Sequence, residues 1–140
     1  IIRDLFMNIL LDTHLVLWAL SDDKRLTPAA RELILDERNT LFYSIASMWE
    51  VSIKHSLHPE TMTISGTEFM HYCENAGYHR LSICDKHIIS LETLYQKEGC
   101  IIHKDPFDRV LLAQAKAENF IFLTHDSAFS SYNENCFILV

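Results

Sequence analysis

The sequence alternates short apolar runs with segments that favour helix, and this alternation limits the fold more than any other feature. Apolar or β-branched runs lie at residues 7–11, 40–45, 78–83, 120–123 and 136–140. Helix-favouring segments separate them, at residues 14–20, 27–37, 46–56, 67–76, 85–97, 106–118 and 127–132. Strands that alternate with helices indicate a parallel sheet covered on both faces. We therefore predict an α/β fold, a three-layer α/β/α sandwich with a central parallel sheet of about five strands.

Proline and glycine set several helix boundaries. Asp105 directly precedes Pro106, and proline is favoured at the first helical position because its missing N–H has no partner there. Gly99 is the expected stop of the helix at residues 85–97. Residues 61–64 form a connector, with at most a short extended piece.

The size and composition of the chain are those of one globular domain. It has 140 residues, of which 49% are hydrophobic, so it can bury a core and is unlike a disordered chain. No apolar run approaches the length of a membrane span and no signal peptide is evident, so we expect a cytoplasmic protein. Residues 1–6 precede a plausible start at Met7 and are interpreted as an extension or a cloning remnant, leaving one domain at residues 7–140.

Charge, cysteine and histidine usage exclude some classes of function. The net charge of −7 argues against a protein that coats nucleic acid by charge alone, but not against an enzyme whose bound cations meet the phosphate. The 4 cysteines are scattered without a C-x-x-C pair, so we expect reduced thiols. The 8 histidines show neither H-x-x-x-H nor H-E-x-x-H spacing, so a zinc site is not indicated.

Acidic residues fall where predicted strands end or helices begin. Asp12 follows the first strand and Asp126 follows the fourth, while Glu50 lies in the helix after the second strand. Because parallel strands end at one edge of a sheet, we expect Asp12 and Asp126 to be neighbours, with Glu50 nearby. Asp108 joins them if the helix at residues 106–118 packs with its N-terminal end close to this edge.

These acids also have purely structural explanations. Asp12 and Asp126 both precede short helices and suit helix N-caps, a role worth about 1 kcal/mol. Ser47 and Glu50 match the spacing of a capping box, in which Glu50 reaches back to a backbone N–H. Taken singly, each acid is explained by capping.

Asp105 competes with Asp108 for a functional role. Asp105 fits the N-cap position before Pro106, which explains it without chemistry. The helix dipole favours an acid at Asp108, but this residue also shares a helical stripe with Leu112 and Ala115. We therefore prefer Asp108 as a ligand.

Taken together, the acids indicate a metal site. Glu50 shares a stripe with Ala46 and Ile53, and carboxylates on core-facing stripes are costly unless they are paired or metal-bound. Several acids at one edge repel one another, and a hard cation such as Mg²⁺ or Mn²⁺ removes that repulsion. The expected ligands are Asp12, Glu50, Asp108 and Asp126, and the neighbours expected to orient them are Thr13, Ser47 and Thr124.

Four blocks of this sequence resemble those of PIN-domain ribonucleases, and most closely those of the VapC-like toxins of bacterial toxin–antitoxin pairs. In chain order they are LLDTHLVLWAL, SIASMWEVSIK, HKDPFDRVLLAQAKAE and FLTHD. The resemblance runs from Met7 to the C-terminus. It implies a PIN-like fold and an endonuclease that cuts RNA with one or two Mg²⁺ or Mn²⁺ ions. The catalytic acids of that family fall here on Asp12, Glu50, Asp108 and Asp126, and its conserved hydroxyl falls on Thr124.

The resemblance also implies partners. VapC-like proteins are typically homodimers held inactive by a small antitoxin, and as toxins they inhibit translation or growth by cutting RNA such as tRNA or rRNA. No membrane partner is implied. Trp18, Trp49 and Phe69 suit either antitoxin contacts or the core, and we prefer the core. His14 and His125 occur in many such sequences, and we assign neither a catalytic role.

Some alternatives remain open at this point. Arg109 either contacts RNA phosphate or pairs with a neighbouring acid. A phosphatase of the haloacid-dehalogenase type needs a D-x-D motif, and His14 stands where its second aspartate would be. A catalytically silent PIN-like module is disfavoured because every acid is present, whereas a DNA-directed nuclease is not excluded.

Overall fold

A five-stranded sheet forms the centre of the computed structural model, which describes residues 6–100 and 103–140. The strands lie in the order β3-β2-β1-β4-β5, and all neighbouring pairs are parallel. Their bounds are β1 (Asn8–Leu11), β2 (Thr40–Ser44), β3 (His79–Leu81), β4 (Ile121–Thr124) and β5 (Phe137–Leu139). The predicted parallel sheet is confirmed.

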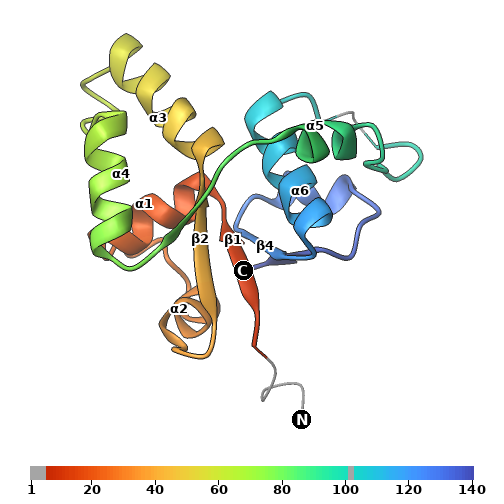
Figure 1. The fold of residues 1–140 in the computed structure, drawn as a ribbon, viewed down its shortest axis with the longest axis horizontal. Helices are drawn as coiled ribbons and strands as arrows, with labels where there is room; N and C mark the ends of the chain where they lie inside the picture. Colours follow the sequence, from red (N-terminus) through yellow and green to blue (C-terminus); the bar gives the residue numbers. More distant parts are fainter. Residues whose placement is uncertain (1–5, 101–102) are drawn as a thin grey trace.

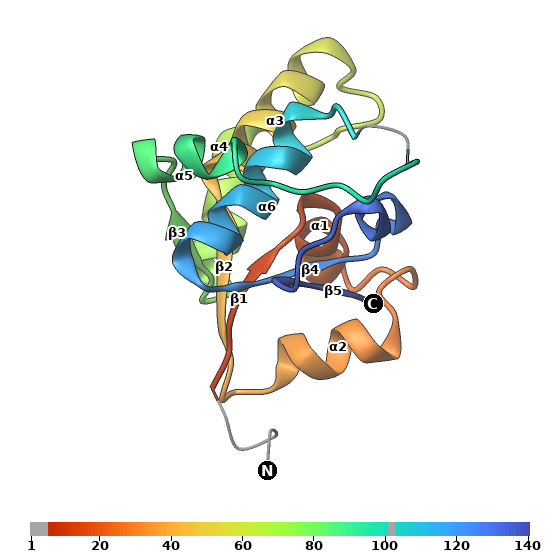
Figure 2. The same ribbon diagram turned by 90° about the vertical axis from the view of Figure 1, so that its right-hand side faces the viewer.

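Helices cover both faces of this sheet, as predicted for a three-layer sandwich. They are α1 (Thr13–Ser21), α2 (Pro28–Leu35), α3 (Ile45–Leu57), α4 (Gly66–Asn75), α5 (Asp85–Leu91), α6 (Pro106–Glu118) and the 3₁₀ helix η2 (Ser127–Ser131). Figure 1 shows α1, α3 and α4 on one side of the strands and α5 and α6 on the other. Figure 2 shows α2 beside the N-terminal end of β1, away from α3.

The core divides into two clusters because successive strand residues point to opposite faces. Ile9 and Leu11 of β1 pack in one cluster, whereas Leu10 between them packs in the other. Helix residues complete the first cluster with Leu15, Val16, Val51 and Phe69, and the second with Leu111, Leu112, Ala115 and Phe129. Burial on both faces holds β1 firmly at the centre, so the residue that follows it is fixed in position.

The predicted helix at residues 85–97 is wrong in its second half, because α5 ends at Leu91. Beyond this point the backbone bonds to a distant segment, and the N–H of Lys97 donates to the carbonyl of Ser131 at 2.7 Å. That pairing replaces further helical turns. Gly99 has a positive φ of 80° but lies in a turn, so it does not end a helix.

Other boundaries differ by small amounts. The last helix is a 3₁₀ helix, and residues 61–64 form no regular structure. Most of the proposed extension at residues 1–6 lies outside the described residues, and Phe6 is 81% exposed. All of the cysteines are free, as predicted. Among the described residues, we find no helix with the length and apolar character needed to cross a membrane.

Candidate metal centre

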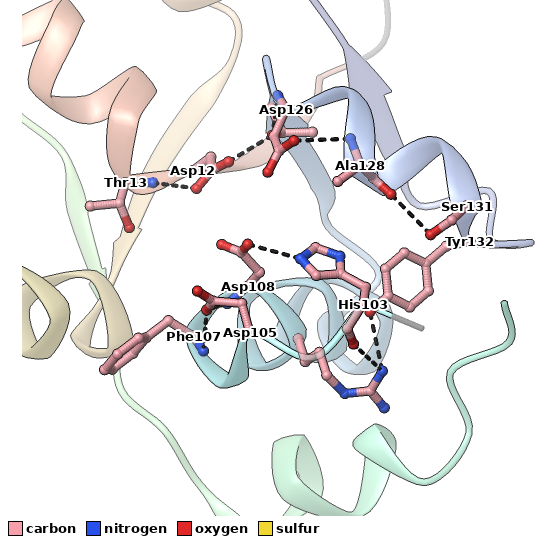
Figure 3. Close-up of polar contacts among 12 residues, drawn as sticks. Asp12, Thr13, His103, Asp105, Phe107, Asp108, Asp126, Ala128, Ser131 and Tyr132 are labelled. Carbon is pink, nitrogen blue, oxygen red and sulfur yellow. Dashed lines mark hydrogen bonds and ion pairs between the residues drawn. The ribbon is translucent and has the colours of Figure 1, made fainter. Parts of the chain in front are cut away.

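Asp12 and Asp126 lie at the ends of adjacent strands and are joined through Thr124. Asp12 directly follows β1, and its Oδ1 accepts a hydrogen bond of 2.7 Å from the Thr13 N–H. Its Oδ2 accepts a bond of 2.6 Å from Thr124 Oγ1, and that threonine Oγ1 accepts the Asp126 N–H at 3.1 Å. Asp126 in turn caps η2 through the Ala128 N–H. Figure 3 shows Asp12, Asp126 and Asp108 gathered at this end of the sheet.

Burial dominates the electrostatics of Asp12. Its residue is only 5% exposed, and loss of solvation raises the pKa of its carboxyl. The Thr124 hydrogen bond and the charge of His14 lower this pKa, while the charge of Glu50 raises it further. Asp12 caps a helix, but that role alone does not call for a second acid nearby.

Glu50 does not belong to a capping box, and that alternative is wrong. The N-cap of α3 is Ser44, whose Oγ accepts the Ala46 N–H at 2.9 Å, so Ser47 lies inside the first turn. Instead, Thr13 Oγ1 lies 2.7 Å from Ser47 Oγ and 3.0 Å from Glu50 Oε1. A carboxylate can only accept, so Thr13 donates to Glu50. The end of β1 is thereby linked to α3.

Glu50 is a buried carboxylate that pairs with Lys54. It is 7% exposed, and its Oε2 lies 2.6 Å from Nζ of the half-exposed Lys54. The residues buried with it on α3 include Ala46 and Val51. Ile53 is 36% exposed, so the predicted core-facing stripe is wrong at this residue.

The two aspartates at the start of α6 have different surroundings. Asp105 is the N-cap, and its Oδ1 accepts the N–H groups of Phe107 at 2.9 Å and Asp108 at 3.1 Å, as predicted. The Asp108 side chain is 19% exposed, and its Oδ2 lies 3.0 Å from His103 Nε2. Asp105 caps the N-terminus of α6, so Asp108 is not needed as a cap.

Asp108 and Asp12 interact electrostatically although they come from distant parts of the chain. Burial raises the pKa of Asp108 to about 7, and the negative charges of Asp12 and Asp105 act in the same direction. Hydrogen bonding and charge from His103 oppose this shift without cancelling it. Two acids held close enough to repel each other suit a cation between them.

His103 is the residue that the sequence analysis missed. Together with Asp108 and Asp126 it offers ligand atoms that all lie within 4.8 Å of one another. Its Nδ1 is buried and has no hydrogen-bond partner among the described residues. The sequence signal was a histidine just before the N-cap of α6, but its position beside Asp108 depends on the packing of its ring against Phe129 and Tyr132.

Arg109 supports the His103 segment. Its Nη1 donates to the backbone carbonyl of His103 at 3.3 Å and to the Tyr132 hydroxyl at 3.2 Å. Tyr132 is buried in the core, so this guanidinium links α6 to the segment after η2. The expected roles of Arg109 toward RNA phosphate or a neighbouring acid remain predictions.

The donor set suits a hard divalent cation. The predicted ligands Asp12, Glu50, Asp108 and Asp126 all offer carboxylate oxygens, which Mg²⁺ and Mn²⁺ prefer. Among the described residues, the group at this site whose ligand atoms lie within 4.8 Å of one another contains Asp108 and Asp126 with His103, and it includes neither Asp12 nor Glu50. Thr13 and Thr124 fix two of these carboxylates by hydrogen bonds. Burial and the negative charge of Asp12 disfavour the ionised form of Asp108, and a bound cation would offset that repulsion.

Comparison with known proteins places this arrangement in a family. A model described as the PIN domain matches residues 9–135 of the chain. The chain belongs to the PIN domain family. The predicted membership is therefore confirmed, and the match spans all four acids of this PIN domain.

Solved structures share the fold of this PIN domain at low sequence identity. One is a chain in the crystal structure of VapBC2 from Rickettsia felis bound to a DNA fragment from their promoter, with a TM-score of 0.65, 17% identity, and coverage of 95% of this chain and 98% of that chain. Another is a domain of a functionally unknown protein from Methanocaldococcus jannaschii, with a TM-score of 0.55, 15% identity, and coverage of 96% and 91%. No protein of curated function matches the sequence.

Proposed function

We propose that this PIN domain is an endoribonuclease that depends on Mg²⁺ or Mn²⁺ and acts as the toxin of a VapC-like toxin–antitoxin pair. The observation that carries the proposal is that Asp12, Asp108 and Asp126, from three separate parts of the chain, gather at one end of the sheet. Burial and the charge of Asp12 raise the pKa of Asp108 to about 7, in a chain whose family members are generally nucleases. The proposal includes a cytoplasmic location, because the RNA substrate would be found there.

Each residue of the site has a distinct task in this proposal. Asp12, Glu50, Asp108 and Asp126 would hold the ion, which when bound polarises the phosphodiester and makes water more acidic. Thr13 and Thr124 keep the carboxylates of Glu50 and Asp12 in place through hydrogen bonds. Because burial raises the pKa of Asp108 to about 7, this carboxyl is partly protonated near neutral pH and would have to lose its proton to hold a cation.

The test is cleavage of RNA by the purified protein. We expect cutting with Mg²⁺ or Mn²⁺ and none with EDTA, and loss of cutting in Asp12→Asn and Asp108→Asn without unfolding. Asp105→Asn is the matched control, because asparagine also caps helices and Asp105 is assigned no ligand role. Full activity in EDTA or in Asp108→Asn would sink the proposal, and cutting of DNA alone would favour the DNA-nuclease alternative.

A small antitoxin is the proposed protein partner. A pocket of about 660 Å³ is lined by residues that include Trp18, Met62, Ile64, Tyr72 and His14, whose charge acts on Asp12. Its lining is largely apolar, which suits an amphipathic segment of a partner. The VapBC2 name of the matching structure supports a paired protein. Of the aromatic residues expected in the core, Phe69 lies there, whereas that expectation is wrong for Trp49, which is 57% exposed.

Growth of bacteria tests the toxin role separately from catalysis in vitro. Expression of the wild type should arrest growth, whereas expression of Asp126→Asn should not, because that variant lacks one of the proposed ligands. Co-expression of the neighbouring antitoxin gene should relieve the growth arrest caused by the wild type. It should not relieve the arrest caused by the Trp18→Ala variant. Equal growth of wild type and Asp126→Asn would count against a toxin.

A homodimer is part of the same proposal. Trp49, Ile53 and Leu57 recur at helical spacing along α3 and are 57%, 36% and 68% exposed. An exposed apolar stripe of this kind suits contact with a second copy. Light scattering of the purified protein should give twice the mass of one chain, and Leu57→Lys should lower it. A monomeric wild type would contradict this assignment.

A further inference from the structure

His103 brings a nitrogen atom into the group of acids, from the segment that leads into α6. One ligand atom from each of His103, Asp108 and Asp126 lies within 4.8 Å of the other two. Figure 3 shows the His103 ring reaching the Asp108 carboxylate and lying between that acid and Tyr132. The side chain of His103 is 10% exposed, so its ring is largely shielded from water. Ligand atoms of two kinds therefore meet at this end of the sheet.

The distance between His103 and Asp108 is that of two neighbouring ligands on one ion. His103 Nε2 lies 3.0 Å from Asp108 Oδ2. On a six-coordinate ion with bonds of about 2.1 Å, neighbouring ligand atoms meet at right angles and are about 3 Å apart. One proton joins the nitrogen to the oxygen here, and an ion held by both atoms would take the place of that proton.

Asp108 and Asp126 each keep an oxygen for such an ion. Asp108 uses Oδ2 toward His103, and Asp126 uses Oδ1 to accept the Ala128 N–H at 2.9 Å. Within residues 6–100 and 103–140, no group donates to the second oxygen of either side chain. The second oxygens are therefore available to a ligand from outside the chain.

The ring of His103 is held in place by several parts of the fold. Its centroid lies 5.0 Å from that of Phe129 and 5.5 Å from that of Tyr132. Its backbone N–H donates to Gln96 Oε1 at 3.3 Å, and its carbonyl accepts from Arg109 Nη1 at 3.3 Å. A side chain fixed by packing and by hydrogen bonds of its backbone is prepared to act as a ligand.

No hydrogen bond commits the proton of His103 to Nε2. Its Nδ1 is buried and has no partner in the described part of the chain, so the ring can carry its proton there and offer the Nε2 lone pair. His87 differs, because its Nδ1 accepts the Cys84 backbone N–H at 3.2 Å. That bond places the His87 proton on Nε2, which lies 2.6 Å from Glu118 Oε2. We therefore assign no metal to the group of Cys84, His87 and Glu118.

We propose that His103 Nε2 binds the divalent cation together with Asp108 and Asp126, and that this nitrogen makes the site favour Mn²⁺ over Mg²⁺. The inference rests on the proposed function, because it concerns the same site. Mg²⁺ prefers oxygen ligands, whereas first-row transition ions also accept an imidazole nitrogen. Of the two ions expected at this site, Mn²⁺ is therefore the one that gains from a histidine.

Orientation of Asp108 by a hydrogen bond is the competing explanation for His103. In that case Nε2 keeps its proton and donates to the carboxylate while the ion is bound. Such a role needs a donor at this position but no lone pair. His103→Gln supplies a donor amide without an imidazole nitrogen, whereas His103→Phe keeps an aromatic ring against Phe129 and Tyr132 and supplies neither.

The experiment records pulsed electron paramagnetic resonance of Mn²⁺ bound to the full chain at about pH 8. We expect the hyperfine coupling of a directly bound nitrogen in the wild type, and we expect both His103 variants to lack it. His125→Gln is the matched control and should keep the coupling. His125 directly precedes Asp126 but lies outside the group of close ligand atoms, and its Nδ1 contacts the Val140 carbonyl.

Titration with each ion gives a second readout that does not depend on cleavage. The wild type should bind Mn²⁺ at least about ten-fold more tightly than Mg²⁺, and His103→Gln should lower this ratio at least about five-fold. An unchanged ratio in a folded His103→Gln protein would show that His103 only orients Asp108, and would overturn the proposal.

The wild-type spectrum tests the nitrogen ligand without any variant. Saturable Mn²⁺ binding with no nitrogen coupling would overturn the role of His103 and leave the proposed metal site standing. Coupling that persists in both His103 variants would assign the nitrogen to another residue and would also overturn it. Absence of saturable Mn²⁺ binding by the wild type would instead contradict the proposed function.

Discussion

Thr124 Oγ1 donates a 2.6 Å hydrogen bond to Asp12 Oδ2, and this bond joins the ends of the two central strands. The same hydroxyl accepts the Asp126 N–H, so a single side chain sets the positions of two acids. Hydrogen-bond partners of this kind orient ligands at metal sites. Thr124 is fully buried, and so its hydroxyl is held in one environment.

Thr124→Val should therefore lower RNA cleavage by about 10–100-fold, the usual effect of losing a group that orients a ligand. Valine keeps the shape of threonine but neither donates to Asp12 nor accepts from Asp126. Thr124→Ser keeps the hydroxyl and is the matched control, which should stay close to wild type. Cleavage rates at saturating Mn²⁺ provide the measurement, and equal rates for the valine and serine variants would refute the role of the hydroxyl.

The raised pKa of Asp108 predicts how the stability of the metal-free protein depends on pH. The pKa of Asp108 is about 7 in the folded state, against an ordinary value of 3.8 for an aspartate side chain. Between these values the folded state holds a proton that the unfolded state has released, so the folded state binds more protons. The free energy of unfolding should consequently fall as pH rises from about 4 to about 7 and level off above that.

Asp108→Asn isolates this contribution because asparagine does not titrate. In urea unfolding with EDTA, the variant should lose less stability than the wild type between about pH 5 and about pH 8, and should be the more stable of the two at the higher pH. Adding Mn²⁺ at the higher pH should stabilise the wild type more than the variant. Identical pH profiles for the two proteins would show that Asp108 does not carry the shift.

Gly66 lies where α4 packs closely on α3. A Cβ at this position would collide with Ser52 Oγ and would lie 3.1 Å from Ser52 Cβ and 3.4 Å from the Met48 carbonyl oxygen. Gly66→Ala should therefore destabilise the domain by about 1–3 kcal/mol, the usual cost of overpacking. Adding Ser52→Ala removes the colliding oxygen and should recover part of that loss in thermal unfolding. An unchanged melting temperature in Gly66→Ala would contradict this packing.

The sequence was informative where local chemistry decides the structure. Pro106 predicted the start of α6, and this distinguished the capping residue Asp105 from Asp108. The predicted ends of two strands gave the positions of Asp12 and Asp126. These features depend on residues close together in the chain. The catalytic roles of the acids remain predictions that the fold is consistent with.

Long-range contacts decided the rest. The His103 ring is held beside Asp108 by packing against Phe129 and Tyr132, and beyond Leu91 the backbone N–H of Lys97 bonds to Ser131, so both features depend on segments that meet only in the folded molecule. The N-cap of α3 fell on Ser44 rather than Ser47 because β2 runs directly into the helix. Periodicity within one segment carries no information about such junctions.

The central claim is that acids from separate elements form one divalent-cation site. Calorimetric titration of the metal-free protein with Mn²⁺ at about pH 8 tests it most directly, since Asp108 is then ionised. We predict saturable binding by the wild type and by Asp105→Asn, and binding weakened at least about ten-fold in Asp12→Asn, Glu50→Gln, Asp108→Asn and Asp126→Asn. Wild-type affinity in all four of these variants would contradict the account.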